Sequence, residues 1–157
     1  MMEQQEASGD AVMTRIGQAI MLLHGGDREE ARNRFGALWS EIGEAGDPLH
    51  RCTLAHYMAD TQDDPGDELA WDLRALSAAE GLSDERLARR QEALAVRAFF
   101  PSLHLSLAAD YVKLQRPEAA RVHLDRARAA TDALGDDGYE NGVRAAIDRL
   151  EHGLRGE

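Results

Sequence analysis

Apolar residues recur every three or four positions along most of the chain, which is the spacing of one face of an α-helix. The second predicted helix shows this clearly, because it carries Ala31, Phe35, Leu38 and Ile42 on one face. No segment alternates apolar and polar residues with the enrichment in β-branched side chains that a strand would show. The pattern therefore predicts an all-α protein.

Capping residues, glycines and prolines divide this pattern into eight predicted helices. Asp10 can cap the first helix, which Gly25 and Gly26 end near His24. Asp27 caps the second, Asp47 with Pro48 starts the third, and the segment QDDPGDE turns the chain into the fourth. A short fifth helix follows the cap at Ser83 and is broken by Phe99, Phe100 and Pro101. The last three cover about 102–114, 117–133 and 139–153, whereas residues 1–9 are predicted to be a disordered tail before a single domain at 10–157.

One helix pair carries a more specific motif. The segment LAADYVKLQRPEAARVHLDRA (107–127) supplies, with the histidine three residues before it, a fixed series of positions: His104, Leu107, Ala108, Tyr111, Ala120, Leu124 and Ala127. This spacing resembles the tetratricopeptide signature W-x2-L-G-x2-Y followed by A-x3-F. The resemblance implies a helical hairpin with small residues where two helices approach closely, and the stacking of such hairpins into a superhelix.

Two other helix pairs resemble this unit less closely. Ala19, Leu22, Ala31 and Phe35 fit the first pair, and Leu54 with Ala55 fit the second, whose loop is about two residues longer. Residues 82–100 are predicted to be an inserted segment, and 139–153 resemble the capping helix of a solenoid. We therefore expect a tetratricopeptide-like α–α superhelix of about eight helices, with about three degenerate units.

Composition narrows the classes of protein that fit this chain. Its 157 residues suit one domain with a real core, and 43% hydrophobic with 30% charged residues predict a soluble protein. No apolar run approaches the roughly 18 residues of a membrane span, and the N-terminus does not resemble a signal peptide. The single cysteine, Cys52, excludes an internal disulfide framework. We expect a cytoplasmic protein with no membrane partner.

The net charge of −11 is concentrated in the first half of the chain. Residues 1–82 hold 16 acidic and 6 basic groups, a balance of −10, whereas residues 83–157 hold 13 and 12. The acidic half would repel a polyanion, so no nucleic-acid partner is expected. A basic partner fits this charge, and so does an acidic surface that only keeps the protein soluble.

The resemblance implies that the first helix of each pair lines a concave face. Helical periodicity then gives the residues that face away from the second helices, an apolar groove with a few polar points: Met13, Ile16, Ile20, Leu23, His24, Cys52, His56, Asp60, Leu105, Ala109, Val112 and Lys113. Such a groove is typical of a site for a helix or an extended peptide. The family's peptide-carboxylate clamp needs Lys, Asn and Arg there, and of these only Lys113 is present.

Other candidate chemistry is sparse. His24, Cys52 and His56 have a metal-compatible spacing, but they also fit the edge of a groove, so no metal site and no cofactor is predicted. No GxSxG, P-loop, HExxH or GxGxxG motif is present, so no enzyme is expected. The inserted segment has arginines that could hold a phosphate or pair with the acidic half of the chain: Arg86, Arg89, Arg90 and Arg97.

The sequence therefore predicts a non-catalytic adaptor that binds a protein or peptide in its groove. Two alternatives remain open. The protein could be a ligand-responsive regulatory module, with the arginine-rich segment as a second contact. It could instead be a self-associating structural protein, such as a homodimer, whose groove is filled by its own chain.

Overall fold

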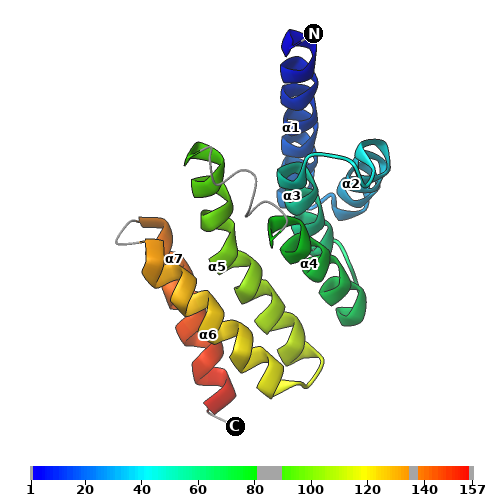
Figure 1. Cartoon of the computed structure of the whole chain (residues 1–157). Helices are drawn as coiled ribbons and strands as arrows, with labels where there is room; N and C mark the ends of the chain where they lie inside the picture. The colour runs from blue at the N-terminus through cyan, green and yellow to red at the C-terminus, as the bar shows by residue number, and fades with distance from the viewer. Residues whose placement is uncertain (1, 81–89, 135–137, 156–157) are drawn as a thin grey trace.

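The computed structural model describes residues 2–80, 90–134 and 138–155, and their side chains over 11–80, 100–132 and 142–155 (Figure 1). These ranges contain seven helices and no strand: α1 (Met2–His24), α2 (Arg28–Ile42), α3 (Pro48–Ala59), α4 (Pro65–Glu80), α5 (Arg90–Lys113), α6 (Pro117–Leu134) and α7 (Gly138–Arg155). The all-α prediction is confirmed for this part of the chain. None of these seven helices is both long and apolar enough to cross a membrane.

Consecutive helices pack as hairpins. α1 pairs with α2, α3 with α4 and α5 with α6, and α7 packs against both α6 and α5 (Figure 1). The three hairpins are joined in order, since α2 contacts α3 and α4 contacts α5. α1 also contacts α3, so successive first helices touch at this end of the molecule.

Two expectations about the helices are wrong. The predicted break at Pro101 is absent, and one continuous α5 takes in residues 90–100 of the predicted insertion, which gives seven described helices instead of eight. A proline inside a helix removes one backbone hydrogen bond, but Pro101 is buried and Leu103 and Leu107 beside it are fully buried, so packing outweighs this local preference. α1 begins at Met2, whereas the first helix is predicted to begin after the cap at Asp10.

Alanines bring the helices of the first and third hairpins together. Ala19 and Ala31 are fully buried between α1 and α2, and Ala108 and Ala120 are fully buried between α5 and α6. On the second helices the inward stripe repeats at i, i+4, i+7 and i+11: Ala31, Phe35, Leu38 and Ile42 in α2, and Ala120, Leu124, Ala127 and Thr131 in α6. The two hairpins therefore build their cores at equivalent positions, 89 residues apart in the sequence.

The turns of these two hairpins have the same backbone geometry. Gly26 has a φ of 94° and Gln115 a φ of 60°, so both lie in the left-handed region. The same hydrogen bond spans each turn, from Asp27 N to Leu22 O and from Arg116 N to Tyr111 O, both at 2.8 Å. This is the Schellman arrangement that ends a helix. The turns follow the same 89-residue register as the cores, so the alignment of the first and third units extends to their backbone.

A pair of tryptophans joins the first and second hairpins. Trp39 of α2 and Trp71 of α4 meet edge to face, with ring centroids 5.1 Å apart. The Arg51 guanidinium lies 4.2 Å from the centre of the Trp39 ring, and that of Arg74 lies 4.4 Å from the centre of the Trp71 ring. These contacts hold α2 against the α3–α4 pair, whose inner face carries the candidate site.

Candidate functional site

The inward stripe of α4 begins with two acidic residues. Glu68, Asp72, Ala75 and Ala79 repeat the spacing at which α2 buries Ala31 and Phe35 at its first two positions. Asp72 is only 1% exposed and the Glu68 side chain only 17%. A buried carboxylate is costly unless it is neutralised or hydrogen-bonded, so carboxylates at these two packing positions need a compensating group.

A third acid faces them from α5. Asp110 is also 1% exposed, and one oxygen from each of Glu68, Asp72 and Asp110 can be chosen so that all three lie within 4.8 Å of one another. Among the described residues, neither oxygen of Asp110 has a hydrogen-bond partner, and neither does Oδ1 of Asp72. We call these three residues the acidic cluster.

Asp72 and Asp110, the two buried aspartates of the acidic cluster, have raised pKa values. Burial raises the pKa of Asp72 to about 7. Burial and the neighbouring Asp72 carboxyl raise the pKa of Asp110 to about 10. In neutral solution Asp110 therefore carries a proton that it can share with Asp72. Without that proton both groups are acceptors only and face each other with no donor between them.

Basic groups surround the acidic cluster unevenly. Lys113 donates to Glu68, with 2.8 Å between Nζ and Oε1, and its own side chain is 53% exposed. His56 of α3 places Nδ1 3.7 Å from Asp72 Oδ1, too far for a hydrogen bond. Burial lowers the pKa of His56, although the charges of Asp60 and Asp110 oppose this, so the ring tends to be neutral. Lys113 thus compensates Glu68, and the two aspartates have no cation in hydrogen-bond contact among the described residues.

Three equivalent residues meet at the outer rim of this site. In the aligned units His24, Asp60 and Lys113 occupy the same position, at or just beyond the ends of α1, α3 and α5. Asp60 is exposed; its partial burial raises its pKa, and the neighbouring His56, Lys113 and His24 oppose this shift. The ends of the three first helices are therefore near enough for His24 and Lys113 to influence the pKa of Asp60.

The apolar part of the predicted groove is largely packed inside the protein. Ile16 and Cys52 are each 1% exposed and belong to the core. Ile16 lies in a cluster with Leu54 and Met58 of α3, and Cys52 lies in one with Leu103 and Leu107 of α5. These faces of α1 and α3 therefore meet neighbouring helices of the same chain, because each first helix needs a partner for its second apolar side.

The remaining predicted groove residues are divided between packing and surface. Ile20 and Leu23 are half-buried against the core cluster of α1, α2 and α3. Leu105 and Val112 are half-buried against the core cluster of α5, α6 and α7. Ala109 is half-buried, and Met13 is 42% exposed. The exposed polar members are His24, Asp60 and Lys113, with His56 half-buried beside the acidic cluster. The polar points are brought together, whereas the apolar positions serve mainly as contacts between helices.

The histidine–cysteine combination does not form a metal-ligand group. Burial raises the pKa of the Cys52 thiol to about 12, which keeps it protonated, and thiolate is the form that binds metals. Among the described residues the group of three with suitable geometry is the acidic cluster. The arginine-rich motif lies outside the described side chains, since 81–89 are not described and Arg90 and Arg97 are placed only by their backbone in α5.

Sequence reasoning missed all three acids of the cluster. Leu69, Leu73 and Leu76 have the spacing of an apolar face on α4, but Leu73 is 41% exposed and the buried face turns toward Asp72 and Ala75. One signal in the sequence could have found Glu68 and Asp72. If the i, i+4, i+7, i+11 spacing of the inward residues of α2 is applied to α4 starting at Glu68, both acids fall on the inward face. Acidic residues in a helix usually face the solvent, so the general preference predicts the wrong face of α4 for these acids.

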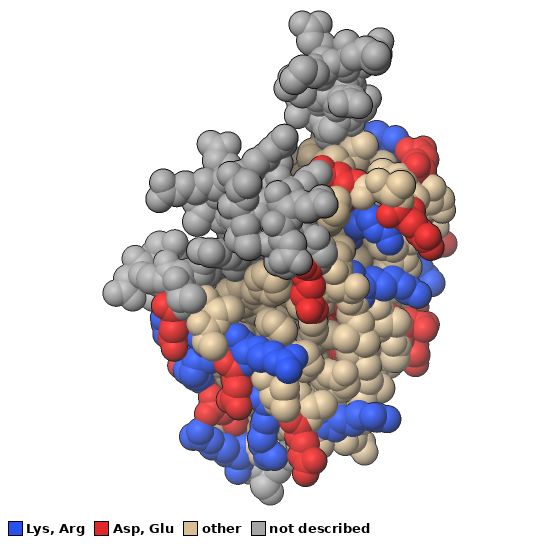
Figure 2. Space-filling model, viewed as in Figure 1, with Lys and Arg blue, Asp and Glu red and all other residues tan. Residues whose placement is uncertain are grey.

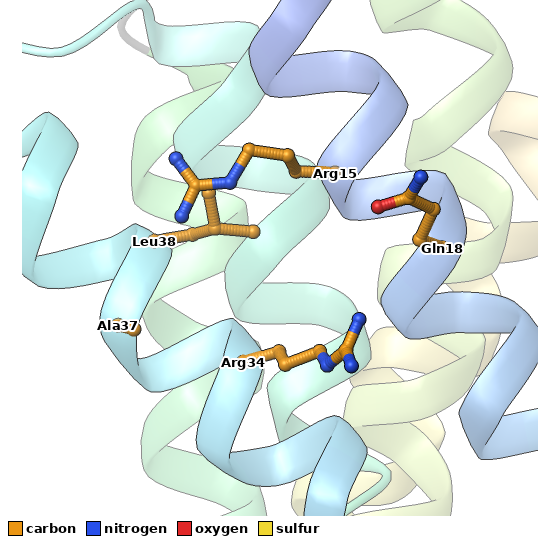
Figure 3. Close-up of a pocket in the computed structure, with 5 residues that line it drawn as sticks. All are labelled: Arg15, Gln18, Arg34, Ala37 and Leu38. Atoms are coloured by element: carbon orange, nitrogen blue, oxygen red, sulfur yellow. The ribbon is translucent and has the colours of Figure 1, made fainter.

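A surface pocket of about 210 Å³ lies elsewhere, between α1 and α2 (Figure 3). Figure 3 shows Arg15 and Gln18 on α1 facing Arg34, Ala37 and Leu38 on α2. Both arginines already have acidic partners, Arg15 with Glu41 at 2.6 Å and Arg34 with Glu30 at 3.1 Å. This pocket holds no unpartnered buried group, so it is a weaker candidate than the acidic cluster.

Surface charge gives no sign of a polyanion-binding face in the view of Figure 2. Lys and Arg side chains are interleaved there with Asp and Glu, both over α2 and over the α6–α7 region. Several of them form exposed ion pairs, such as Arg128 with Asp148 and Arg144 with Asp132. Exposed pairs of this kind contribute little to stability.

Comparison with protein-family models, with curated proteins and with solved structures finds no match to this chain. The functional proposals below therefore rest on its own residues and their geometry.

Proposed function

We propose that this protein is a non-catalytic adaptor built of tetratricopeptide-like hairpins. It binds a protein or peptide by holding a basic side chain of that partner. The observation that carries the proposal is the convergence of His24, Asp60 and Lys113 beside the acidic cluster. Equivalent positions of stacked hairpins form a composite surface, and such surfaces are where repeat proteins bind their partners. The shared turns and cores of the first and third hairpins support this architecture.

The charge of the surface favours a cationic group in the partner. Asp60 and Glu68 contribute carboxylates to this surface, whereas Asp72 and Asp110 are buried and Lys113 is already paired with Glu68. Asp60 is exposed and can accept hydrogen bonds from a guanidinium or ammonium group at the rim. The first half of the chain, which contributes three of these acids, also has most of the net negative charge.

The location differs from the long apolar groove that the sequence predicts. Because Ile16 and Cys52 are core residues, a partner helix has no continuous apolar groove along them. We therefore place binding at the polar rim, with the half-buried Leu23 and Val112, which adjoin His24 and Lys113 in the sequence, as apolar contacts. This arrangement suits a short segment better than a long helix.

A peptide library tests the proposal. Peptides selected on the full chain from a random displayed library should be enriched in Arg or Lys, and their affinity should fall with added salt. Asp60→Asn keeps the size of the side chain and removes its charge, so it should weaken binding of a selected peptide about tenfold or more. Asp125→Asn makes the same change at an exposed position on α6 and should leave Kd unchanged.

The result can also exclude the proposal. Selection that returns no basic peptide, or a Kd that is the same for wild type and Asp60→Asn, would overturn it. Light scattering at several protein concentrations is the companion measurement. If a dimer forms as the protein concentration rises, and Asp60→Asn prevents it, the rim binds a second copy of this chain instead.

A further inference from the structure

We propose that Glu68, Asp72 and Asp110 form a binding site for a hard divalent cation, Mn²⁺ or Mg²⁺. The inference goes beyond the adaptor function and does not depend on it. Two observations support it independently: the oxygens of these three residues lie within 4.8 Å of one another, and those of Asp110, with Oδ1 of Asp72, are deeply buried without a hydrogen-bond partner among the described residues.

The backbone places the three carboxylates around one point. Glu68 and Asp72 are four residues apart on α4, so their side chains lie on the same face of that helix. Asp110 approaches from α5, which packs directly against α4. Metal–oxygen distances of about 2.1 Å allow opposite ligand oxygens to be about 4.2 Å apart, and oxygens of neighbouring ligands are closer still. The span of the acidic cluster therefore allows all three groups to reach one ion after small side-chain movements.

The charges also balance. Three ionised carboxylates carry three negative charges, Lys113 supplies one positive charge through Glu68, and a divalent cation supplies the other two. Lys113 contacts Oε1 of Glu68, and a carboxylate has a second oxygen to offer an ion. Without a cation, burying Asp72 and Asp110 together requires a proton between them.

The choice of ion follows from the donors. Carboxylate oxygens suit Mg²⁺, Ca²⁺ and Mn²⁺, whereas Zn²⁺ in structural sites is held mainly by thiolate and imidazole. Ca²⁺ takes six to eight oxygens, whereas Mg²⁺ is commonly held by a few carboxylates and keeps water molecules as its other ligands. A neutral His56, 3.7 Å from Asp72 Oδ1, is placed to orient that carboxylate through a hydrogen bond after a small shift. Mn²⁺ is accordingly the best probe, because it tolerates a nitrogen donor and has an electron paramagnetic resonance signal.

The experiment uses the full chain, freed of metal with EDTA and then dialysed. Mn²⁺ is titrated while its free signal is followed by electron paramagnetic resonance, with thermal unfolding measured in parallel. We expect one saturable Mn²⁺ per chain and a melting temperature that rises with Mn²⁺ concentration, because the ion binds the folded state. Mg²⁺ should compete for the same site.

Isosteric variants identify the ligands. Asp110→Asn should weaken Mn²⁺ binding at least tenfold, while the metal-free variant melts no lower than wild type, since the amide can donate to Asp72 as the protonated Asp110 does. Asp125→Asn, exposed on α6, should bind Mn²⁺ like the wild type. If Asp110→Asn does not fold, Glu68→Gln at the half-buried edge of the cluster provides the same test.

Three results would overturn the proposed cation site: no saturable Mn²⁺ binding by the wild type, equal Mn²⁺ affinity in wild type and variants, or a melting temperature that does not change with Mn²⁺ concentration. In each case a shared proton is what satisfies the two aspartates. None of these results bears on the peptide experiment, which is carried out without added metal, so the two proposals fail separately.

Discussion

A pair of histidines buried between α5 and α6 should contribute a loss of stability in acid, opposite in sign to the contribution of the buried aspartates Asp72 and Asp110, whose pKa values are raised. The rings of His104 and His123 stack, and their Nδ1 atoms lie 3.0 Å apart, so one ring must donate and the other accept. Two protonated rings would place two donors against each other. Burial, with the charges of His123 and Arg126, lowers the pKa of His104 from 6.5 to about 4, and burial with Arg126 lowers that of His123. Both histidines are therefore neutral in the folded protein at pH 7.

The sign and the size of the effect follow from these values. As the pH falls below 6.5, the unfolded chain binds a proton at His104 before the folded protein does, so stability is lost progressively between pH 6.5 and about 4. The pKa of His104 is 6.5 in the unfolded chain and about 4 in the folded protein. These two values give a loss in the free energy of unfolding of about 2 kcal/mol from His104 alone between pH 7.5 and pH 5. His123 shifts in the same direction and adds to the loss.

Urea unfolding followed by circular dichroism at the two pH values measures this loss. His104→Gln keeps a polar partner for His123 and removes the titrating group, so the change in its stability from pH 7.5 to pH 5 should be about 2 kcal/mol more favourable than that of the wild type. His152→Gln makes the same change at an exposed site on α7 and should behave like the wild type. If the wild type and His104→Gln lose stability equally, the assignment of acid sensitivity to this pair is refuted.

Three further changes test the packing, the turns and the buried thiol. Phe35→Ala should lower the free energy of unfolding by about 3–5 kcal/mol because Phe35 is fully buried, whereas Leu73→Ala, at a 41% exposed position, should cost less than about 1 kcal/mol in the same urea titration. Gln115→Gly should raise stability by about 1 kcal/mol and Gly26→Ala should lower it by about as much, because both positions have positive φ; equal melting temperatures would contradict this. Cys52, whose pKa burial raises to about 12, should react with a thiol reagent only after unfolding, and fast reaction of the native protein would show that it is accessible.

Local signals in the sequence were sufficient for the helices whose ends are marked by caps and turns. Asp47 with Pro48 predicts the start of α3, where the Asp47 side chain accepts a hydrogen bond from Leu49 N at 2.9 Å. Gly25 and Gly26 predict the end of α1 at His24, because the turn needs a left-handed residue. Signals of this kind act within a few residues, so they can be read without knowing the fold.

Where tertiary packing decides, the sequence was a poorer guide. Pro101 has the local preference of a helix breaker, yet α5 continues through it because Leu103 and Leu107 beyond it are buried against other helices. The same limit explains the groove. Periodicity shows that Ile16 and Cys52 are on a second apolar face, but whether that face meets solvent or a neighbouring helix depends on how closely the hairpins stack.

The site was predictable only in its outer part. His56, Asp60 and Lys113 came from the repeat register, which aligns equivalent positions and so places the ends of the first helices together. The buried acids could not be predicted in this way, because Glu68 and Asp72 resemble the many solvent-facing carboxylates of an acidic chain. Their burial depends on the rotation of α4 about its axis, and Asp110 matters only because α5 packs on that face.

The acidic cluster is the place where the second hairpin departs from its neighbours. α2 has Ala31 and Phe35 at the first two stripe positions, and a phenylalanine there contributes several kcal/mol of apolar burial, whereas α4 has Glu68 and Asp72. Natural sequences break a local packing rule mainly at functional sites, since selection for stability alone would favour an apolar pair. The cluster also lies where α4 meets α5, the contact that joins the second hairpin to the third. A change in its charge must alter the free energy of that contact, so a cation that binds there should change the stability of the whole chain, and this makes thermal unfolding a sensitive measurement for the site.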